Sequence, residues 1–426
     1  MAAAWLVASR YPVTVYEREL QVGGHTHTVD VKTSRGMVPV DTGFIVYNEP
    51  NYPNLTALFA HLDVATKASD MGFSVSLDNG ALEYAGSLTG LVAQPANLLR
   101  SDFLRMLRDT LRFYRDADGS IGQAPVRSTL GEYLADNNYS EAFARLHLLP
   151  MGAAIWSSSL DDMRAYPMAA FARFFANHGL LKLLGRPQWR TVVGGSREYA
   201  KKLTARYTKN IRINCGAKVI LRGAEGVTIV DQRGNSDRYD GVIVATHADQ
   251  ALAMLGDPSV EETNLLGSFK YRPNKVVLHS DTTFMPKRKM AWSSWNYMGR
   301  SDQDGREDLC VTYWMNKLQG IDKRTPIFVT LNPASMPRDE TIYGAYNCAH
   351  PLFNERAIAA QRRLWRLQGS RATWFCGSYF GSGFHEDALQ AGLAAAEDAT
   401  GLRRPWRVAE ESSRISIIPK PVRTAA

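Results

Sequence analysis

A carboxylate near the start of the chain follows a short β-branched segment. Residues 13–16 read Val-Thr-Val-Tyr, which predicts a strand, and Glu17 comes directly after it. Residues 1–10 are rich in small apolar side chains and predict the last turns of a helix. In a dinucleotide-binding βαβ unit, a carboxylate at the end of the second strand binds the ribose hydroxyls. Glu17 is therefore a candidate ribose ligand, and the alternative is an ordinary solvated carboxylate.

The phosphate-binding loop of such a unit should precede this carboxylate by about 20 residues. Counting back from Glu17 places the Gly-x-Gly-x-x-Gly loop before Met1, where the sequence does not contain it. We therefore expect roughly a dozen further residues upstream, holding a first strand and the loop.

A series of glycine-containing motifs follows Glu17. It consists of Gly23, Gly24 and Thr28, then Asp41 and Gly43, then Gly194 and Gly195, then Val219, then Gly377, Ser378, Gly383, Phe384, Glu386 and Asp387. In this order the series resembles the FAD-dependent amine oxidases, phytoene desaturases and protoporphyrinogen oxidases. The resemblance implies FAD as the cofactor and these residues as its contacts. Paired glycines let the backbone approach the pyrophosphate and ribityl chain, and the N-terminus of the last helix would point at the flavin's pyrimidine edge.

A closer resemblance is to a bacterial subgroup of predicted NAD/FAD-binding proteins. It rests on residues 23–28 (Gly-Gly-His-Thr-His-Thr), 40–48, 177–181 (Asn-His-Gly-Leu-Leu), 292–297 and 383–387 (Gly-Phe-His-Glu-Asp). Some members of that subgroup modify membrane fatty-acyl chains. The resemblance implies an apolar small molecule or a lipid as substrate.

Two histidines are the candidates for catalysis. His385 adjoins the predicted flavin-facing start of the last helix, and His178 ends an apolar helix in the predicted substrate cap. Flavin chemistry needs a substrate C–H bond directed at the flavin and in some cases a base, a role that histidine can fill. For each histidine the alternative is a hydrogen-bonded structural role.

The order of predicted elements indicates an α/β protein with a discontinuous, Rossmann-like FAD-binding domain of the amine-oxidase type. Alternating strands and helices at both ends place residues 1–86, 190–255 and 365–410 in that domain. Helical periodicity over residues 87–189 predicts a helical cap, and strand-like runs over residues 256–364 predict a β-rich part of the substrate domain. Asn79-Gly80 between two alternating segments predicts a hairpin over residues 71–86.

Composition limits the remaining possibilities. Of the 426 residues 45% are hydrophobic and 22% charged, as in ordinary globular proteins. The four cysteines are scattered without metal-ligand spacing, so no metal is expected. No apolar run approaches the roughly 20 residues of a membrane span, and without an export signal we expect a cytoplasmic protein.

The net charge of +8 favours anionic partners in general, and no motif indicates a specific nucleic acid. Residues 100–115 predict a basic amphipathic helix, with four arginines on one face and leucines 104, 107 and 111 on another: Arg105, Arg108, Arg112 and Arg115. Such a helix can lie on the inner face of an anionic membrane, and the alternative is the solvated face of a cap helix.

Three functions remain open at this stage. The leading hypothesis is an FAD-dependent oxidoreductase that dehydrogenates or isomerises an apolar substrate, with a phospholipid acyl chain as one candidate. A soluble amine oxidase would require an aromatic cage and acidic groups for an ammonium, whereas the predicted cap is rich in arginine and aliphatic residues. A non-catalytic flavoprotein remnant would follow if the phosphate loop is truly absent.

Overall fold

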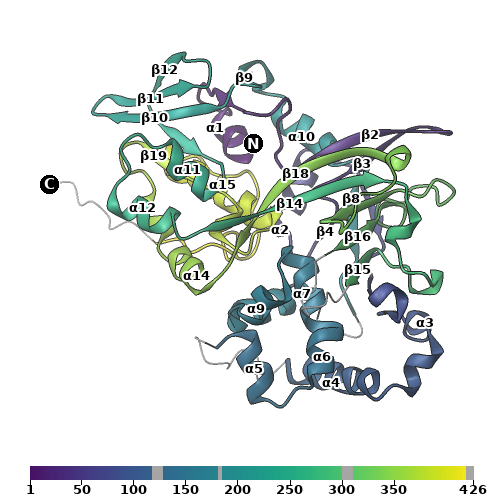
Figure 1. Ribbon diagram of the computed structural model, residues 1–426. Coiled ribbons are helices and arrows are strands. Elements are labelled where there is room, and N and C mark those ends of the chain that lie inside the picture. The colour runs from purple at the N-terminus through teal and green to yellow at the C-terminus, as the bar shows by residue number, and fades with distance from the viewer. Residues whose placement is uncertain (118–127, 181–184, 300–309, 419–426) are drawn as a thin grey trace.

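The structure is a computed structural model that describes residues 1–117, 128–180, 185–299 and 310–418. Strands and helices from the two ends of the chain lie together on one side of the molecule (Figure 1). A helical block lies below them, and a large sheet extends to the opposite side. The mixed α/β architecture agrees with the predicted fold class.

Parallel strand pairs characterise the region built from both chain ends. β1 (Val15–Tyr16) pairs with β9 (Ile211–Arg212), and β13 (Val242–Val244) pairs with β19 (Thr373–Phe375). Within the described ranges these pairs form separate sheets. An antiparallel sheet accompanies them, made of β10 (Ala217–Gly223), β11 (Gly226–Asp231) and β12 (Ser236–Tyr239). Parallel pairing requires crossover connections, and the long chain segments between these strands supply them.

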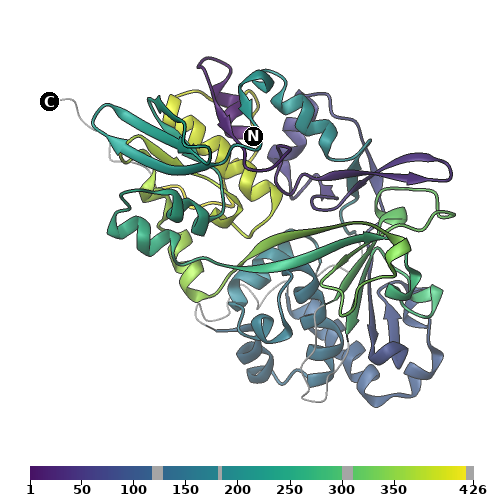
Figure 2. The same ribbon diagram turned by 45° about the horizontal axis from the view of Figure 1, so that its top comes forward.

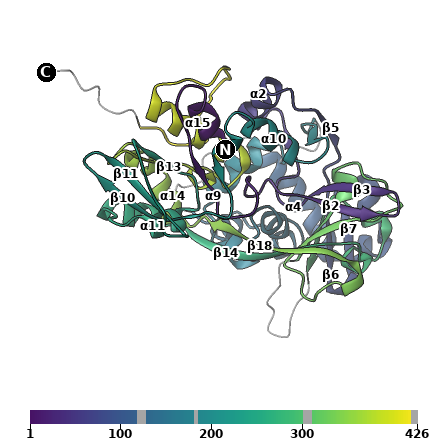
Figure 3. The same ribbon diagram turned by 90° about the horizontal axis from the view of Figure 1, so that it is seen from above.

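Four helices of this region pack against one another. They are α1 (Ala2–Val7), α2 (Pro53–His61), α10 (Arg197–Thr204) and α15 (His385–Thr400), which lie side by side in the view from above (Figure 3). Their apolar faces share one core that includes Trp5, Leu55, Tyr199, Leu393 and Ala396. Gly401 follows the last residue of α15, and its φ of 71° is the left-handed conformation that commonly ends a helix.

A seven-stranded sheet forms the opposite side of the molecule, in the order β18-β14-β17-β16-β15-β6-β7. Its strands are β18 (Ile342–Leu352), β14 (Lys270–His279), β17 (Phe328–Leu331), β16 (Val311–Trp314), β15 (Trp295–Gly299), β6 (Phe73–Leu77) and β7 (Leu82–Ala85). β14 and β18 pair along their whole length, from Lys270 opposite Leu352 to His279 opposite Ile342. These two long strands extend from the side of the parallel pairs towards the opposite side of the molecule (Figure 2).

The hairpin of β6 and β7 has the predicted turn, because Asn79 and Gly80 have φ of 56° and 88°. The hairpin also joins a larger sheet. β6 pairs in parallel with β15, so the hairpin belongs to the same sheet as residues 256–364 and not to a sheet of residues 1–70. A run of alternating residues does not specify which strand lies beside it. The division into domains stays a prediction.

Smaller sheets connect these regions. β2 (Thr28–Thr33) and β3 (Gly36–Asp41) form a hairpin, and β8 (Trp189–Val192) lies between β4 (Tyr47–Asn48) and β5 (Thr66–Ser69). The other helices outside the helical block are α11 (Ala248–Met254), α12 (Val260–Leu266), α13 (Met315–Leu318) and α14 (Glu355–Gln361).

The helical block follows the hairpin. It contains α3 (Leu88–Leu91), α4 (Ser101–Ala117), α5 (Leu130–Asp136), α6 (Glu141–Phe143), α7 (Leu149–Trp156), α8 (Leu160–Arg164) and α9 (Met168–Asn177). Local sequence starts several of these helices: Thr129 and Glu132 form a capping box at α5, and Ser159 and Asp162 form one at α8. None of the described helices combines the length with the apolar character that crossing a bilayer requires.

The predicted faces of α4 were partly wrong. Phe103, Met106 and Phe113 form its buried face, whereas Leu104 and Leu111 are exposed. The aromatic side chains fill the block because they offer the larger apolar area, and they fix a different rotation of the helix from the one that the leucines suggested.

Candidate functional site

Glu17 lies directly after β1, as predicted. Its amide donates to the carbonyl oxygen of Arg212 (2.9 Å), which extends the parallel pairing with β9. Its carboxylate accepts a hydrogen bond from the amide of Glu19 (3.0 Å), and the residue is half-buried. Dinucleotide-binding sheets hold their ligand at the carboxyl ends of parallel strands. The position suits the ribose contact, which stays a prediction.

The glycines after Glu17 meet in a double loop. Gly23 has a φ of 130°, and a Cβ there would lie 2.7 Å from the carbonyl oxygen of Thr26. A Cβ on Gly43 would lie 2.2 Å from the carbonyl oxygen of His25, so both positions require glycine. A Cβ on Gly24 would meet no atom within 4 Å. The backbone at Gly24 therefore borders open space, as a loop that cradles a cofactor must.

Asp41 joins three parts of the chain. Its carboxylate accepts hydrogen bonds from the Thr28 hydroxyl (2.5 Å), the Ser196 amide (2.8 Å) and the Gln319 side chain (3.0 Å). Burial raises the pKa of Asp41, and the hydrogen bonds from Thr28 and Ser196 oppose that rise. A Cβ on Gly195 would lie 2.5 Å from the Thr28 methyl group. The structure thus brings these predicted residues together, and it gives the Asp41 carboxylate protein partners.

The other predicted cofactor contacts lie on two further elements. Val219 is half-buried in β10, opposite Val230 of β11. Gly377 follows β19, and a Cβ there would lie 2.6 Å from the Tyr379 ring. The amide of Gly383 donates to the carbonyl oxygen of Ser378 (3.1 Å), which closes a turn between β19 and α15. The turn sets where the N-terminus of α15 lies.

Glu386 is fully buried and joins α15 to α2. Its carboxylate accepts hydrogen bonds from the amides of Asn54 (3.0 Å) and Leu55 (2.9 Å). Both amides lie in the first turn of α2, where backbone donors have no acceptor within the helix. The side chains of Asn54 (2.9 Å) and Gln390 (3.0 Å) donate as well. Burial raises the pKa of Glu386 in spite of these donors. Its carboxylate has a structural use that the motif did not indicate.

Asp387 is also fully buried. It accepts a hydrogen bond from the amide of Phe384 (2.8 Å) and pairs with Arg414 (3.3 Å). Burial raises the pKa of Asp387, and the nearby Arg414 guanidinium opposes that effect. Because both carboxylates have protein partners, the predicted contact of Glu386 and Asp387 with a cofactor would come from the backbone of the first turn of α15.

His385 is held by neighbouring side chains. Its Nε2 is hydrogen bonded to the hydroxyl of Tyr199, which in turn contacts the Thr26 hydroxyl. Its ring stacks on Phe44 with the ring centres 4.0 Å apart. Burial, followed by repulsion from His25, lowers the pKa of His385 to about 3. The imidazole is thus neutral near pH 7, and it links α15, α10 and the loop after β3.

His178 lies in an aromatic group. Its Nδ1 donates to the carbonyl oxygen of Phe174 (2.9 Å), and its ring stacks on Phe174 with the centres 3.8 Å apart. Burial lowers the pKa of His178 to about 3. Within the described residues the buried Nε2 atom has no hydrogen-bond partner. A bare imidazole nitrogen of this kind accepts a hydrogen bond, but its low pKa does not suit a general base near pH 7.

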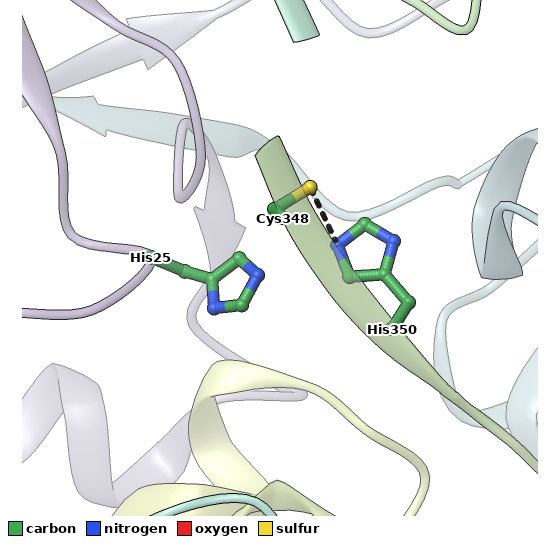
Figure 4. A group of neighbouring side chains, drawn as sticks. All are labelled: His25, Cys348 and His350. Carbon is green, nitrogen blue, oxygen red and sulfur yellow. Dashed lines mark hydrogen bonds between the residues drawn. The ribbon is translucent and has the colours of Figure 1, made fainter. Parts of the chain in front are cut away.

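A group of side chains that the sequence analysis did not identify lies between the glycine loop and β18. His25, Cys348 and His350 have ligand atoms within 4.8 Å of one another (Figure 4). Cys348 and His350 are two residues apart in β18, so that their side chains lie on one face of the strand. That alternation was a signal in the sequence, but only the fold brings His25 to it.

The protonation of this group favours a hydrogen-bonded cluster. The Asn274 side-chain amide donates to Nδ1 of His350 (3.3 Å), so the proton of the neutral ring is on Nε2, which faces the Cys348 sulfur at 3.8 Å. Burial lowers the pKa of His350 to about 3 and raises that of Cys348 to about 11. The thiol and the protonated ring nitrogen would each have to lose a proton before binding a metal ion. The group instead presents neutral hydrogen-bond donors beside the glycine loop.

The chain matches the family model described as flavin containing amine oxidoreductase over residues 1–374. No match was found among curated protein sequences.

Solved structures share the fold at low sequence identity. Cyclohexylamine oxidase from Brevibacterium oxydans IH-35A has 16% identity and a TM-score of 0.63, over 93% of this chain and 95% of that chain. A putrescine oxidase bound to putrescine has 12% identity and a TM-score of 0.64, over 94% and 96%. A CLA-producing fatty acid isomerase from P. acnes has 15% identity and a TM-score of 0.60, over 91% and 92%. Because the family model spans most of the sequence, the chain belongs to the flavin containing amine oxidoreductases and is an FAD-dependent oxidoreductase.

Proposed function

We propose that this enzyme dehydrogenates or isomerises an apolar substrate, for which the acyl chain of a phospholipid is the leading candidate. The main support for the proposal is that the two carboxylates at the start of α15 already have partners within the protein. Glu386 accepts four hydrogen bonds from protein groups, and Asp387 is paired with Arg414. Neither carboxylate is free to bind a substrate ammonium, which an amine oxidase of the kind that we considered would need.

Aromatic side chains form the buried contact between the helical block and the start of α15. The Phe384 ring, at the N-cap of α15, stacks on Phe174 of α9 with the ring centres 4.5 Å apart. The ring centres of Trp156 of α7 and Phe174 are 4.7 Å apart. His178 stacks on Phe174 and is tilted against Phe384, with ring centres 3.8 and 5.7 Å apart. The helical block thus meets the start of α15 through buried rings, and this apolar environment favours a hydrocarbon substrate over a charged one.

The residues of this chain would hold FAD in three ways. Glu17 would bind the adenosine ribose, the backbone around Gly24 would approach the pyrophosphate, and the first turn of α15 would approach the flavin. When bound, FAD supplies the hydride acceptor for dehydrogenation. The open space beside Gly24 and the close backbone approaches at Gly23 and Gly43 support this placement.

Neutral imidazoles fit the role of positioning groups. His385 and His350 each have a pKa of about 3, so neither stores a proton near pH 7. A neutral imidazole N–H donates a hydrogen bond to an oxygen of a cofactor without adding a fixed charge. His178 would accept one through its unpartnered Nε2. We therefore assign His385 and His178 to positioning in place of the general-base role first considered.

Peripheral contact with an anionic membrane is part of the proposal, since the leading substrate is a membrane component. Of the four arginines of α4 that we singled out, Arg108 pairs with Asp109 and the Arg112 guanidinium lies over the Tyr139 ring, 3.8 Å from its centre. The solved fatty acid isomerase shares the fold, which is compatible with a lipid substrate.

Anaerobic reduction of the bound flavin tests the substrate class. The FAD-loaded protein is mixed with phosphatidylcholine vesicles, free fatty acid, cyclohexylamine or putrescine, and bleaching of the flavin absorption band is followed beside mass spectrometry of the lipid. Bleaching or double-bond migration with the lipids supports the proposal. Bleaching by the amines alone would establish an amine oxidase, and a protein that retains no flavin would support the non-catalytic alternative.

A further inference from the structure

The surface formed by α3, α4 and the turn between them has an inverted polarity. In the 3-10 turn Pro95–Leu99, the polar Asn97 is fully buried, whereas Leu99 is 89% exposed. In α3, Leu88 at the start of the helix is 88% exposed. Single exposed aliphatic side chains are common on protein surfaces, but here several of them follow one another closely in the chain.

Hydrogen bonds fix this orientation. The side chain of Asn97 donates to the carbonyl oxygen of Glu83 in β7 (3.0 Å), and the side chain of Gln94 accepts from the amide of Glu83 (2.8 Å). Both polar side chains therefore point at the sheet. The turn cannot rotate Leu98 and Leu99 inward without breaking these bonds, which leaves buried polar groups unpaired.

α4 follows this turn in the chain and carries an alternating stripe of exposed side chains. Leu104, Arg108, Leu111 and Arg115 are spaced by four, three and four residues, so they lie along one line of the helix. All four are exposed, whereas Asp109 on the opposite side is buried and accepts a hydrogen bond from the amide of Ser140 (2.8 Å). Leucines and arginines therefore share the outward face of α4.

We infer that this surface, which we call the leucine–arginine patch (Leu88, Val92, Leu98, Leu99, Leu104, Leu111, Arg100, Arg105, Arg108 and Arg115), inserts its leucines into the headgroup region of an anionic lipid bilayer. Arginine side chains at such a depth extend towards the phosphates while their methylene groups remain among the acyl chains. In Figure 1, α4 lies at the lower edge of the molecule and α3 at its lower right, both on the side away from β10, β11 and β12.

Charge complementarity selects this occupant over a second copy of the chain. Residues 88–117 contain five arginines and three aspartates, which gives a net charge of 5 − 3 = +2. Arg100, Arg108 and Arg115 each pair with one of these aspartates, so Arg105 and Arg112 carry the excess positive charge. Two copies that met through the patch would place like charges against each other, whereas an anionic bilayer would neutralise them. The inference deepens the proposed function, on which it rests for the lipid nature of the substrate.

The salt dependence of binding distinguishes insertion from attraction by charge alone. Charge attraction fades when salt rises from about 0.1 M to about 1 M, because the Debye length shrinks from about 10 Å to about 3 Å. Burial of leucine does not fade in that way. We therefore expect a salt-sensitive part of vesicle binding that depends on the arginines and a salt-resistant part that depends on the leucines.

The experiment is co-sedimentation of the full chain with vesicles of phosphatidylcholine alone or equimolar phosphatidylcholine and phosphatidylglycerol. Leu88→Asn with Leu99→Asn should weaken partitioning by about tenfold for each leucine, at low and at high salt. The matched control is Val260→Asn with Met37→Asn, since Val260 is 79% and Met37 is 60% exposed elsewhere on the surface. The control pair should partition like the wild type.

A second measurement locates the contact. Three of the four cysteines are buried, so an environment-sensitive fluorophore attached to Leu99→Cys has little background from other thiols. Its emission should shift to shorter wavelength with anionic vesicles, and the same label on Val260→Cys should not respond.

Two results would overturn the inference: wild type that ignores anionic vesicles at low salt, or a leucine variant that partitions like the wild type. Self-association that the leucine variant abolishes, without vesicle binding, would assign the patch to a second copy. Vesicle binding is measured without turnover, so a protein that binds vesicles but does not convert lipid would refute the proposed function and leave the patch intact.

Discussion

Replacing Glu386 by alanine should destabilise the protein, because Glu386 joins α2 to α15. The substitution removes the acceptor of two buried backbone amides, those of Asn54 and Leu55, and of the side chains of Asn54 and Gln390. A buried donor without a partner costs about 1–3 kcal/mol, so the two amides alone predict a loss of about 2–6 kcal/mol in the free energy of unfolding. Since globular proteins have about 5–15 kcal/mol of stability in total, the effect should be large.

Urea unfolding, followed by circular dichroism, measures this loss. Glu386→Gln keeps one acceptor oxygen and should lose less stability than Glu386→Ala. The matched control is Glu355→Ala, which removes an exposed glutamate from the first turn of α14 and should change stability by no more than about 0.5 kcal/mol. Unchanged stability of Glu386→Ala together with weaker FAD binding would refute the structural role and restore the predicted contact with the cofactor.

Three further predictions concern the cofactor loop and the buried histidines. Glu17→Ala should weaken FAD binding by about 1.5–3 kcal/mol through the loss of a charge-assisted hydrogen bond, and equal affinity in an equilibrium titration would contradict the ribose contact. Gly43→Ala should lower the free energy of unfolding by more than about 1 kcal/mol, because its Cβ would lie 2.2 Å from the His25 carbonyl oxygen. Gly86→Ala is the control: its Cβ would have its nearest neighbour at 3.8 Å, so it should lose less stability in the same urea unfolding experiment. His178 and His385 have pKa values of about 3 in the folded protein against 6.5 ordinarily, so the unfolded chain binds more protons between these values and stability should fall as pH decreases below 6.5. Urea unfolding at about pH 7 and about pH 5 tests this, with a loss of up to about 1.4 kcal/mol per pH unit for each histidine; His178→Phe should flatten the dependence, and an unchanged slope would show that His178 is not held neutral.

Local patterns predicted much of the secondary structure. The hairpin turn at Asn79 and Gly80, the strand before Glu17 and the helix that begins after Gly383 all appear, because backbone preference and short-range periodicity determine such elements. The face of α4 could not be predicted in the same way. Leucines and aromatic residues both recur at helical spacing there, and the competition for the interior was decided by packing within the helical block.

The sequence by itself determined the family and the positions of the glycine motifs. Glycines mark places where the backbone comes close to a neighbour; at Gly43 a Cβ would lie only 2.2 Å from another backbone atom, so that only glycine fits. The tertiary structure decided what the charged residues beside those motifs do. Asp41 and Glu386 sit in motifs typical of cofactor binding, yet their carboxylates satisfy buried donors from α10 and α2. It also decided that Leu99 faces outward while Asn97 faces inward. A carboxylate or a leucine has the same chemistry everywhere, and only the neighbours that the fold brings to it, often hundreds of residues away, determine which groups need that chemistry.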